Sequence, residues 1–151
     1  MKLTKRGEYG LKALLALAFV YGHRTLSLRE ISLQEKLPIK FLEQIMMILK
    51  RHHFVESVKG KCGGYLLSKP PGEIVLGEVI RAVDGPLAPL ATGEEIEKKI
   101  QTDERHPGLY SALLEVRNAI SELLDHKSLA DICTKSHELT RSKPTRQMYY
   151  I

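Results

Sequence analysis

The apolar residues at the start of the chain recur at helical spacing, and the intervals between these runs carry helix-capping residues. A first helix follows Thr4, a suitable N-cap, and ends at Gly22. A short second helix begins at Ser27, where Glu30 three residues later completes the pattern of a capping box. Pro38 then suits the start of another helix, because that position needs no backbone N–H. The sequence therefore predicts two helices and a tight turn that leads into a third.

The third predicted helix, Ile39 to His52, has two distinct faces. Its apolar stripe, at intervals of three and four residues, comprises Leu42, Ile45, Met46 and Leu49. The opposite face carries Lys40, Glu43, Gln44, Met47 and Arg51. Side chains of this kind read base edges in the major groove, so the two helices and their turn are typical of a helix-turn-helix unit. An amphipathic helix whose polar face is merely solvated is the alternative interpretation.

The next segment changes to a period of two residues. Phe54 to Val58 and Tyr65 to Leu67 are expected to form two short strands, and residues 59–64 between them include three glycines. Lys59 and Lys61 place two positive charges at the tip of this hairpin. A basic hairpin directly after a recognition helix is typical of a wing, whose lysines contact phosphates or the minor groove, although a plain hairpin is the alternative.

The pattern weakens after a short helix predicted at Leu76 to Val83. Residues 85–108 show little sustained periodicity, apart from a turn or two of exposed helix expected at Glu94 to Ile100. A long helix then has apolar residues at alternating intervals of four and three, namely Leu109, Leu113, Val116, Ile120 and Leu123. This seam is expected to form a homodimer, because the small domain before it is already complete. Packing within one chain is the alternative.

These segments predict a mainly α fold with a small β-hairpin wing, which is a winged helix-turn-helix domain plus a long C-terminal dimerisation helix. Residues 1–84 form the DNA-binding domain and residues 85–108 a loop. Residues 109–136 form the dimerisation helix and a short helix that starts at Leu129 and reaches Cys133 or slightly beyond. Residues 137–151 form a tail that is expected to be flexible or loosely packed from Thr140 onward.

Charge adds to this division of the chain. The net charge is +5, but residues 1–84 hold fourteen Lys and Arg against eight Asp and Glu, and the remainder holds nine against ten. A basic first half suits a surface that approaches a polyanion, and Lys5 and Arg6 in the first helix are expected to add phosphate contacts. The longest apolar run, Ala13 to Tyr21, is about half the length of a membrane span, so we expect a cytoplasmic protein without a membrane partner.

Other chemistry is sparse in this sequence. The two cysteines, Cys62 and Cys133, are expected to be reduced thiols. Cys62, between lysines at the tip of the wing, could act as a redox switch, although an ordinary turn residue is the favoured interpretation. The six histidines lack metal-ligand spacing apart from the adjacent pair His52 and His53, so no metal site is assigned. No nucleophile with a base, carboxylate pair or phosphate loop is evident, so an enzyme is the least favoured class and no catalytic residue is assigned.

Four segments match motifs of one known family. They are the opening Met1-Lys2-Leu3-Thr4 with Gly7 and Tyr9, the run Phe41-Leu42-Glu43-Gln44, the wing sequence Gly63-Gly64-Tyr65-Leu66-Leu67, and Leu76-Gly77-Glu78-Val79-Ile80-Arg81-Ala82-Val83. Together they resemble the bacterial winged-helix regulators that include IscR, NsrR and CymR. The long helix from Leu109 and residues 128–131 also look like the dimerisation helix of that family and its continuation.

The resemblance implies a homodimer that binds a palindromic operator in double-stranded DNA. In the family such operators precede genes for iron–sulfur assembly, nitric oxide defence, or sulfur and cysteine metabolism. Many members hold an iron–sulfur cluster with three cysteines in the loop before the dimerisation helix. Here residues 85–108 contain no cysteine, and His106 is their only nitrogen ligand, so we expect no cofactor.

The sequence therefore predicts a dimeric, sequence-specific DNA-binding regulator that is not an enzyme, most simply a repressor. Its signal could come from a regulatory partner protein, or from a small effector near residues 87–108. A protein-interaction module that retains the winged fold, and a cluster-binding redox or iron sensor with atypical ligands, stay open as alternatives.

Overall fold

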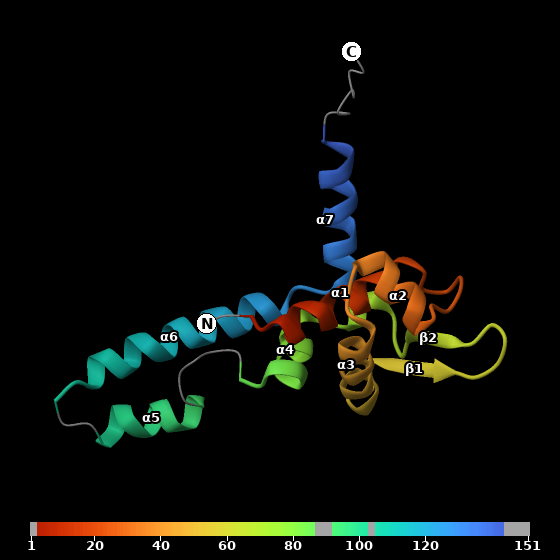
Figure 1. Ribbon diagram of the computed structural model, residues 1–151. Helices are drawn as coiled ribbons and strands as arrows, with labels where there is room; N and C mark the ends of the chain where they lie inside the picture. The colour runs from red at the N-terminus through yellow and green to blue at the C-terminus, as the bar shows by residue number, and fades with distance from the viewer. Residues whose placement is uncertain (1–2, 87–91, 103–104, 144–151) are drawn as a thin grey trace, which may run out of the picture.

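The computed structural model describes residues 3–86, 92–102 and 105–143. Residues 3–86 form a winged-helix unit, from which a two-helix arm and a last helix project (Figure 1). The elements are α1 Lys5–Phe19, α2 Leu28–Glu35, α3 Ile39–Arg51, β1 Val55–Val58, β2 Gly64–Leu67, the 3-10 turn η1 Pro71–Glu73, α4 Leu76–Asp84, α5 Gly93–Thr102, α6 Pro107–Asp125 and α7 Leu129–Arg141. None of the helices within these ranges is long and apolar enough to cross a membrane.

The predicted capping residues start the first two helices. Thr4 Oγ1 accepts the backbone N–H of Gly7 at 3.1 Å, and its own hydroxyl donates to the carboxylate of Asp84 at the end of α4. Ser27 forms the predicted capping box, because its hydroxyl accepts from Glu30 N at 3.1 Å and Glu30 Oε2 accepts from Ser27 N at 2.7 Å. These bonds satisfy backbone donors that helix N-termini leave unpaired.

The core of the winged-helix unit joins α1, α2, α3, α4 and both strands. The predicted apolar stripe of α3 is at most 1% exposed at every position, and Leu14 and Leu17 of α1 meet it in the same cluster. Burial of such side chains stabilises a fold by about 1.5–3 kcal/mol each. Leu129, the first residue of α7, is also fully buried in this cluster. The chain therefore returns to the core of the winged-helix unit after it has formed the arm.

The wing is an antiparallel pair of β1 and β2 in which Val55 pairs with Leu67 and Val58 with Gly64. The segment before α2 extends this hairpin, since Leu26 N donates to Tyr65 O at 3.0 Å and Tyr65 N donates to Leu26 O at 2.7 Å. Gly64 adopts φ +155°, and a Cβ there would meet the carbonyl of Leu26 at 2.5 Å. Only glycine permits this close approach of the two backbones.

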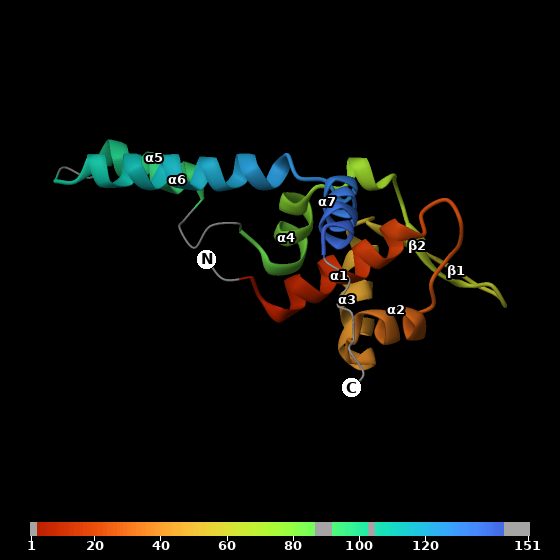
Figure 2. The same cartoon turned by 90° about the horizontal axis from the view of Figure 1, so that it is seen from above.

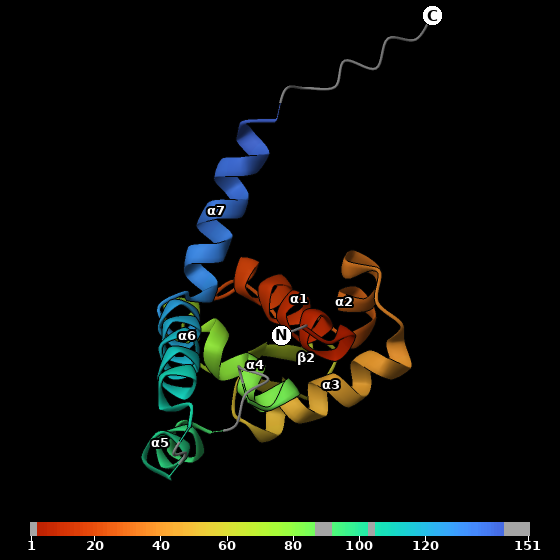
Figure 3. The same ribbon diagram turned by 90° about the vertical axis from the view of Figure 1, so that its left-hand side faces the viewer.

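The arm consists of α5 and α6, which lie side by side and extend away from the winged-helix unit (Figure 2). The short helix expected at Glu94 to Ile100 spans Gly93–Thr102 and packs on α6, with Ile96 buried and Lys99 Nζ 5.3 Å from the centre of the Tyr110 ring. The helix expected to end near Cys133 continues to Arg141 as α7, which points away from the side that carries α3 (Figure 3). Of the predicted tail, residues 144–151 lie outside the described residues.

Candidate nucleic-acid interface

The apolar stripe of α3 is buried in the core, so the polar face of the helix is exposed to solvent. Lys40, Glu43 and Gln44 are all exposed in the first two turns of the helix. Met47, one turn further along, is 63% exposed although its side chain is apolar. The four residues predicted to read DNA therefore lie together on one surface of one helix.

The turn before α3 holds this helix in a fixed direction. Ser32 Oγ donates to Leu37 O at 2.6 Å, and Lys36 adopts a left-handed conformation with φ 54° that ends α2. At the start of α3, the ring of Phe41 meets the ring of Tyr9 of α1 edge to face, with centres 5.6 Å apart. Rotation of α3 about its axis would break this packing, so the exposed face has one orientation.

β1 follows α3 directly, and the hairpin carries its basic tip outward from the end of this helix (Figure 1). Lys59 and Lys61 are exposed at this tip, and Thr25 Oγ1 donates to the carbonyl of Cys62 at 2.9 Å, which anchors the loop to the segment before α2. The Cys62 side chain is exposed. Lys50 Nζ donates to Ser57 Oγ at 2.7 Å and links the end of α3 to the wing.

The Lys50 contact was not among the sequence predictions. Lys50 follows Glu43 and Met47 by seven and three residues, so the helical repeat already places it on the exposed face. Its partner could not be predicted, because the position of Ser57 depends on how the hairpin folds back. Lys50 therefore positions the wing relative to α3.

Several of the cations predicted to contact DNA form no ion pair with the described residues. In the described part of the chain, Lys40, Lys59, Lys61 and Arg6 form no ion pair. Lys5 differs from them, because its Nζ lies 3.6 Å from Glu8 Oε2 and 5.9 Å from the centre of the Tyr9 ring. Charges without internal partners are available to an external polyanion.

α6 carries the five residues of the predicted dimer seam, of which three are exposed and two are half-buried. Leu109, Val116 and Leu123 are 53–66% exposed, and seven residues separate each from the next. Exposed Ala112 and Ala119 lie between them on the same face. The other two seam residues, Leu113 and Ile120, are half-buried next to them on the same stripe of the helix. None of the nineteen residues of α6 is fully buried.

The donor set does not fit an iron–sulfur cluster held within one chain. Such clusters need four ligands, usually thiolates, and the chain has only two cysteines. Cys62 lies at the tip of the wing, whereas Cys133 is half-buried in α7, where burial raises the pKa of its thiol. Within the ranges that the structure describes, no group of three His, Cys, Asp or Glu side chains lies close enough together to hold a metal ion.

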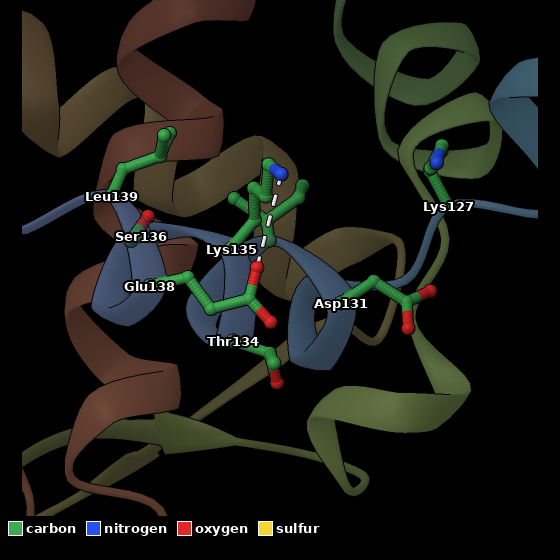
Figure 4. A pocket seen from close by; sticks show the side chains of 8 residues that line it. Lys127, Asp131, Thr134, Lys135, Ser136, Glu138 and Leu139 are labelled. Atoms are coloured by element: carbon green, nitrogen blue, oxygen red, sulfur yellow. Dashed lines mark ion pairs between the residues drawn. The ribbon is translucent and has the colours of Figure 1, made fainter. Parts of the chain in front are cut away.

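A hollow of about 620 Å³ lies along α7 (Figure 4). Its wall is one side of α7 together with Lys127, and every lining residue except Ile132 is exposed. Lys135 and Glu138 form an ion pair with each other at 3.8 Å across this surface. The hollow is therefore an open helix flank without buried polar groups that converge on a ligand.

Comparison with known proteins places this architecture among transcriptional regulators. The model of the Rrf2 family, described as an iron-dependent transcriptional regulator, matches residues 3–135. The HTH-type transcriptional regulator CymR of Bacillus subtilis (strain 168) is 30% identical over 151 residues, which is 100% of both chains. The regulator IscR of Sodalis glossinidius is 40% identical over 84 residues, which is 56% of this chain and 51% of that protein.

The solved structures give the same result. CymR, described as the global cysteine regulator of B. subtilis, superposes with a TM-score of 0.77 and 29% identity, covering 89% of this chain and 98% of that one. IscR of T. potens superposes with a TM-score of 0.72, also at 29% identity, covering 99% and 97%. These regulators are not enzymes, in agreement with the expectation from the sequence.

Proposed function

The chain belongs to the Rrf2 family of transcriptional regulators, and from this premise we propose that it is a homodimer that binds a palindromic operator and represses transcription. The main support for this proposal is the exposed face of α3. Lys40, Glu43 and Gln44 lie together on this face, and the apolar residues of the same helix are buried in the core. In this proposal the protein acts in the cytoplasm on double-stranded DNA.

Each side chain on the face of α3 has a chemical role in this proposal. The Gln44 amide pairs with N6 and N7 of adenine, and the Glu43 carboxylate accepts from N4 of cytosine. Lys40 reaches a guanine or a phosphate, and exposed Met47 supplies an apolar contact to a thymine methyl group. Lys59 and Lys61 of the wing, with Arg6 and Lys5 of α1, contact the phosphate backbone and fix the register of the protein on the duplex.

The homodimer places two copies of α3 on one side of the duplex. The exposed face of α6 supports this part of the proposal, because its apolar residues have no covering element in the described ranges of their own chain. A two-fold axis through paired α6 helices makes the operator an inverted repeat. Successive major grooves on one side of B-DNA lie about 34 Å apart, so the half-sites are about one helical turn apart.

The regulator works without an iron–sulfur cluster in this proposal. The position of the two cysteines on separate elements supports it. Because CymR of B. subtilis is described as a global cysteine regulator, genes of cysteine metabolism are the first targets to test. The signal comes from a partner protein or a small effector.

Selection of bound sequences from random duplex DNA tests this function. Wild-type protein should enrich an inverted repeat, and Glu43→Ala should change the preferred bases within each half-site, because it removes a contact to a base edge. Lys59→Ala is the matched control. It should keep the sequence preference, weaken all sites alike and reduce the salt slope by about one unit, because it removes one phosphate contact.

Three outcomes would count against the proposal. Enrichment of no sequence, together with salt-independent binding, would indicate a protein-interaction module instead of a DNA reader. An unchanged preference in Glu43→Ala would remove the role given to that side chain. Anaerobically purified protein with bound iron and the absorption spectrum of a cluster would show that atypical ligands hold the cofactor.

A further inference from the structure

The point where α6 meets α7 is fastened to the winged-helix unit by two backbone hydrogen bonds. Leu76 N donates to Lys127 O at 2.8 Å, and Leu129 N donates to Ile74 O at 2.9 Å. These bonds form a short antiparallel bridge between the segment before α4 and the segment before α7. The base of the arm therefore has a fixed position against the start of α4.

A side-chain ion pair adds a second point of attachment one turn further along α4. Arg81 of α4 donates from both terminal nitrogens to Asp125, the last residue of α6, at 2.8 Å and 2.7 Å. Arg81 lowers the pKa of Asp125, first through these hydrogen bonds and then through its charge, so the pair stays ionised at neutral pH. Two parallel bonds fix the angle between the groups as well as their distance.

Gly77 makes room for this ion pair. It lies one turn before Arg81 on α4, and a Cβ at this position would overlap the Asp125 carboxylate. Gly77 and Arg81 both belong to the segment 76–83, which the DNA-contacting surface does not use. Both instead serve the contact between α4 and the end of α6.

Because α6 is long, a small change in its direction at the base displaces its far end by a large distance. Its nineteen residues span about 28 Å, so a tilt of about 10° at its base moves the far end by about 5 Å. Neighbouring base pairs are about 3.4 Å apart along the duplex. In a dimer joined through α6, a tilt of this size therefore changes the separation of the two α3 helices by more than one base pair.

We propose that the ion pair between Arg81 and Asp125 sets the half-site spacing of the operator, because it fixes the direction of α6 relative to α3. The inference rests on the proposed function, since spacing has a meaning only for a dimer that binds two half-sites. Arg81 and Asp125 are thus positioning residues that determine specificity without contact to DNA.

The first test compares duplexes that contain the selected half-sites at spacings from two base pairs shorter to two base pairs longer than the optimum. Wild-type protein should prefer one spacing sharply. Asp125→Asn and Arg81→Gln should each reduce the ratio of affinities between the best spacing and its neighbours by about threefold or more, with the same preferred half-site. Arg81→Lys should have an intermediate effect, because it keeps the charge and loses the bidentate geometry.

Two further variants separate positioning from stability. Gly77→Ala should relax the spacing as Asp125→Asn does, because the added methyl group displaces the carboxylate although alanine favours the helix. Lys135→Gln is the control, since it breaks an ion pair of α7 that does not join the arm to the winged-helix unit. Its spacing profile should match wild type. Unchanged profiles in both Asp125→Asn and Gly77→Ala would overturn the proposal.

A measurement without DNA keeps this proposal separate from the proposed function. Two spin labels, attached at Gln34→Cys on α2 and Ser111→Cys on α6, report the distance between the winged-helix unit and the arm. The native cysteines are removed by Cys62→Ser and Cys133→Ala. Dilution with unlabelled chains prevents signals between the two chains of a dimer. The wild-type distribution should be narrow, and Asp125→Asn should broaden it by several ångströms. Distributions of equal width would show that the ion pair between Arg81 and Asp125 does not fix the direction of α6. If wild-type protein selects no DNA sequence, the proposed function fails. The label distances then still show whether this ion pair fixes the arm.

Discussion

The winged-helix unit and the arm contain comparable apolar stripes, but the two stripes differ in how much of each is buried within one chain. In α3 every stripe residue is at most 1% exposed, whereas no residue of α6 is fully buried and Val116 is 53% exposed. α5 and α4 cover one side of α6, and its opposite side carries exposed leucine, valine and alanine. The winged-helix unit thus forms its core largely from its own residues, while the described residues leave one apolar face of the arm uncovered.

The same type of substitution should therefore change stability by very different amounts in the two regions. Ile45→Ala removes a fully buried side chain from α3 and should lower the free energy of unfolding by about 2–5 kcal/mol. Val116→Ala on the exposed face of α6 should change the stability of the monomer by less than about 0.5 kcal/mol. Urea unfolding at protein concentrations below the dimer dissociation constant measures both. A loss of similar size in the two variants would contradict the comparison.

The next largest effect concerns assembly instead of folding. Val116→Asp places a carboxylate in the proposed dimer seam, where two copies lose water without a partner, and should raise the dimer dissociation constant by at least about 100-fold. Asn118→Asp adds the same charge to an exposed position on another face of α6 and should leave the dimer unchanged. Analytical ultracentrifugation distinguishes the two variants. Equal dissociation constants would place the interface elsewhere.

Features that depend on neighbouring residues were predictable from the sequence. The four buried positions of α3 follow from intervals of three and four residues, and the capping box of Ser27 and Glu30 follows from residue types three positions apart. The wing follows from two short strands around glycines. In each case the interaction that determines the structure lies within about two turns of the chain, where spacing alone specifies which residues meet.

Features that depend on distant residues were not predictable. The sequence did not show that Leu113 and Ile120 are half-buried within one chain, because the exposure of each α6 residue depends on where α5 packs, and α5 has a weak apolar pattern. The contact of Arg81 with Asp125 joins positions 44 residues apart. Likewise, nothing near Leu129 indicates that it enters the core of a unit that ends more than forty residues earlier. Such contacts arise from tertiary packing.

α7 could unfold with the winged-helix unit or separately from it. Its capping box gives a direct test, although the expected effect on stability is the smallest of those predicted. Ser128 N donates to Asp131 Oδ2 at 2.9 Å, as Ser27 N donates to Glu30 Oε2 at the start of α2. These backbone bonds are the main cause of the lowered pKa of both carboxyl groups. The burial of Leu129 indicates that α7 unfolds together with the winged-helix unit. In that case the capping boxes of α2 and α7 both stabilise the same folded unit, and the loss of either should shift a single unfolding transition.

The sign of the pH dependence follows from the direction of these shifts. A carboxyl group whose pKa is lower in the folded state contributes stability at pH values above its unfolded pKa, and this contribution is lost as the pH falls through the folded value. The ordinary values are 4.5 for Glu30 and 3.8 for Asp131, so the window lies below about pH 4.5. Glu30→Gln and Asp131→Asn should each be less stable than wild type at pH 7, and the difference should shrink toward pH 3.

Urea unfolding followed by circular dichroism from pH 7 to pH 3 measures these differences, and the Val116→Asp background removes the contribution of dimerisation. Lys135→Gln, one turn further along α7, controls for changes in surface charge. If Glu30→Gln alone shows the pH-dependent difference, the start of α7 unfolds separately and the boundary between unit and arm lies before Leu129. If both variants show it in a single transition, the winged-helix unit includes the start of α7, and the arm is limited to α5 and α6.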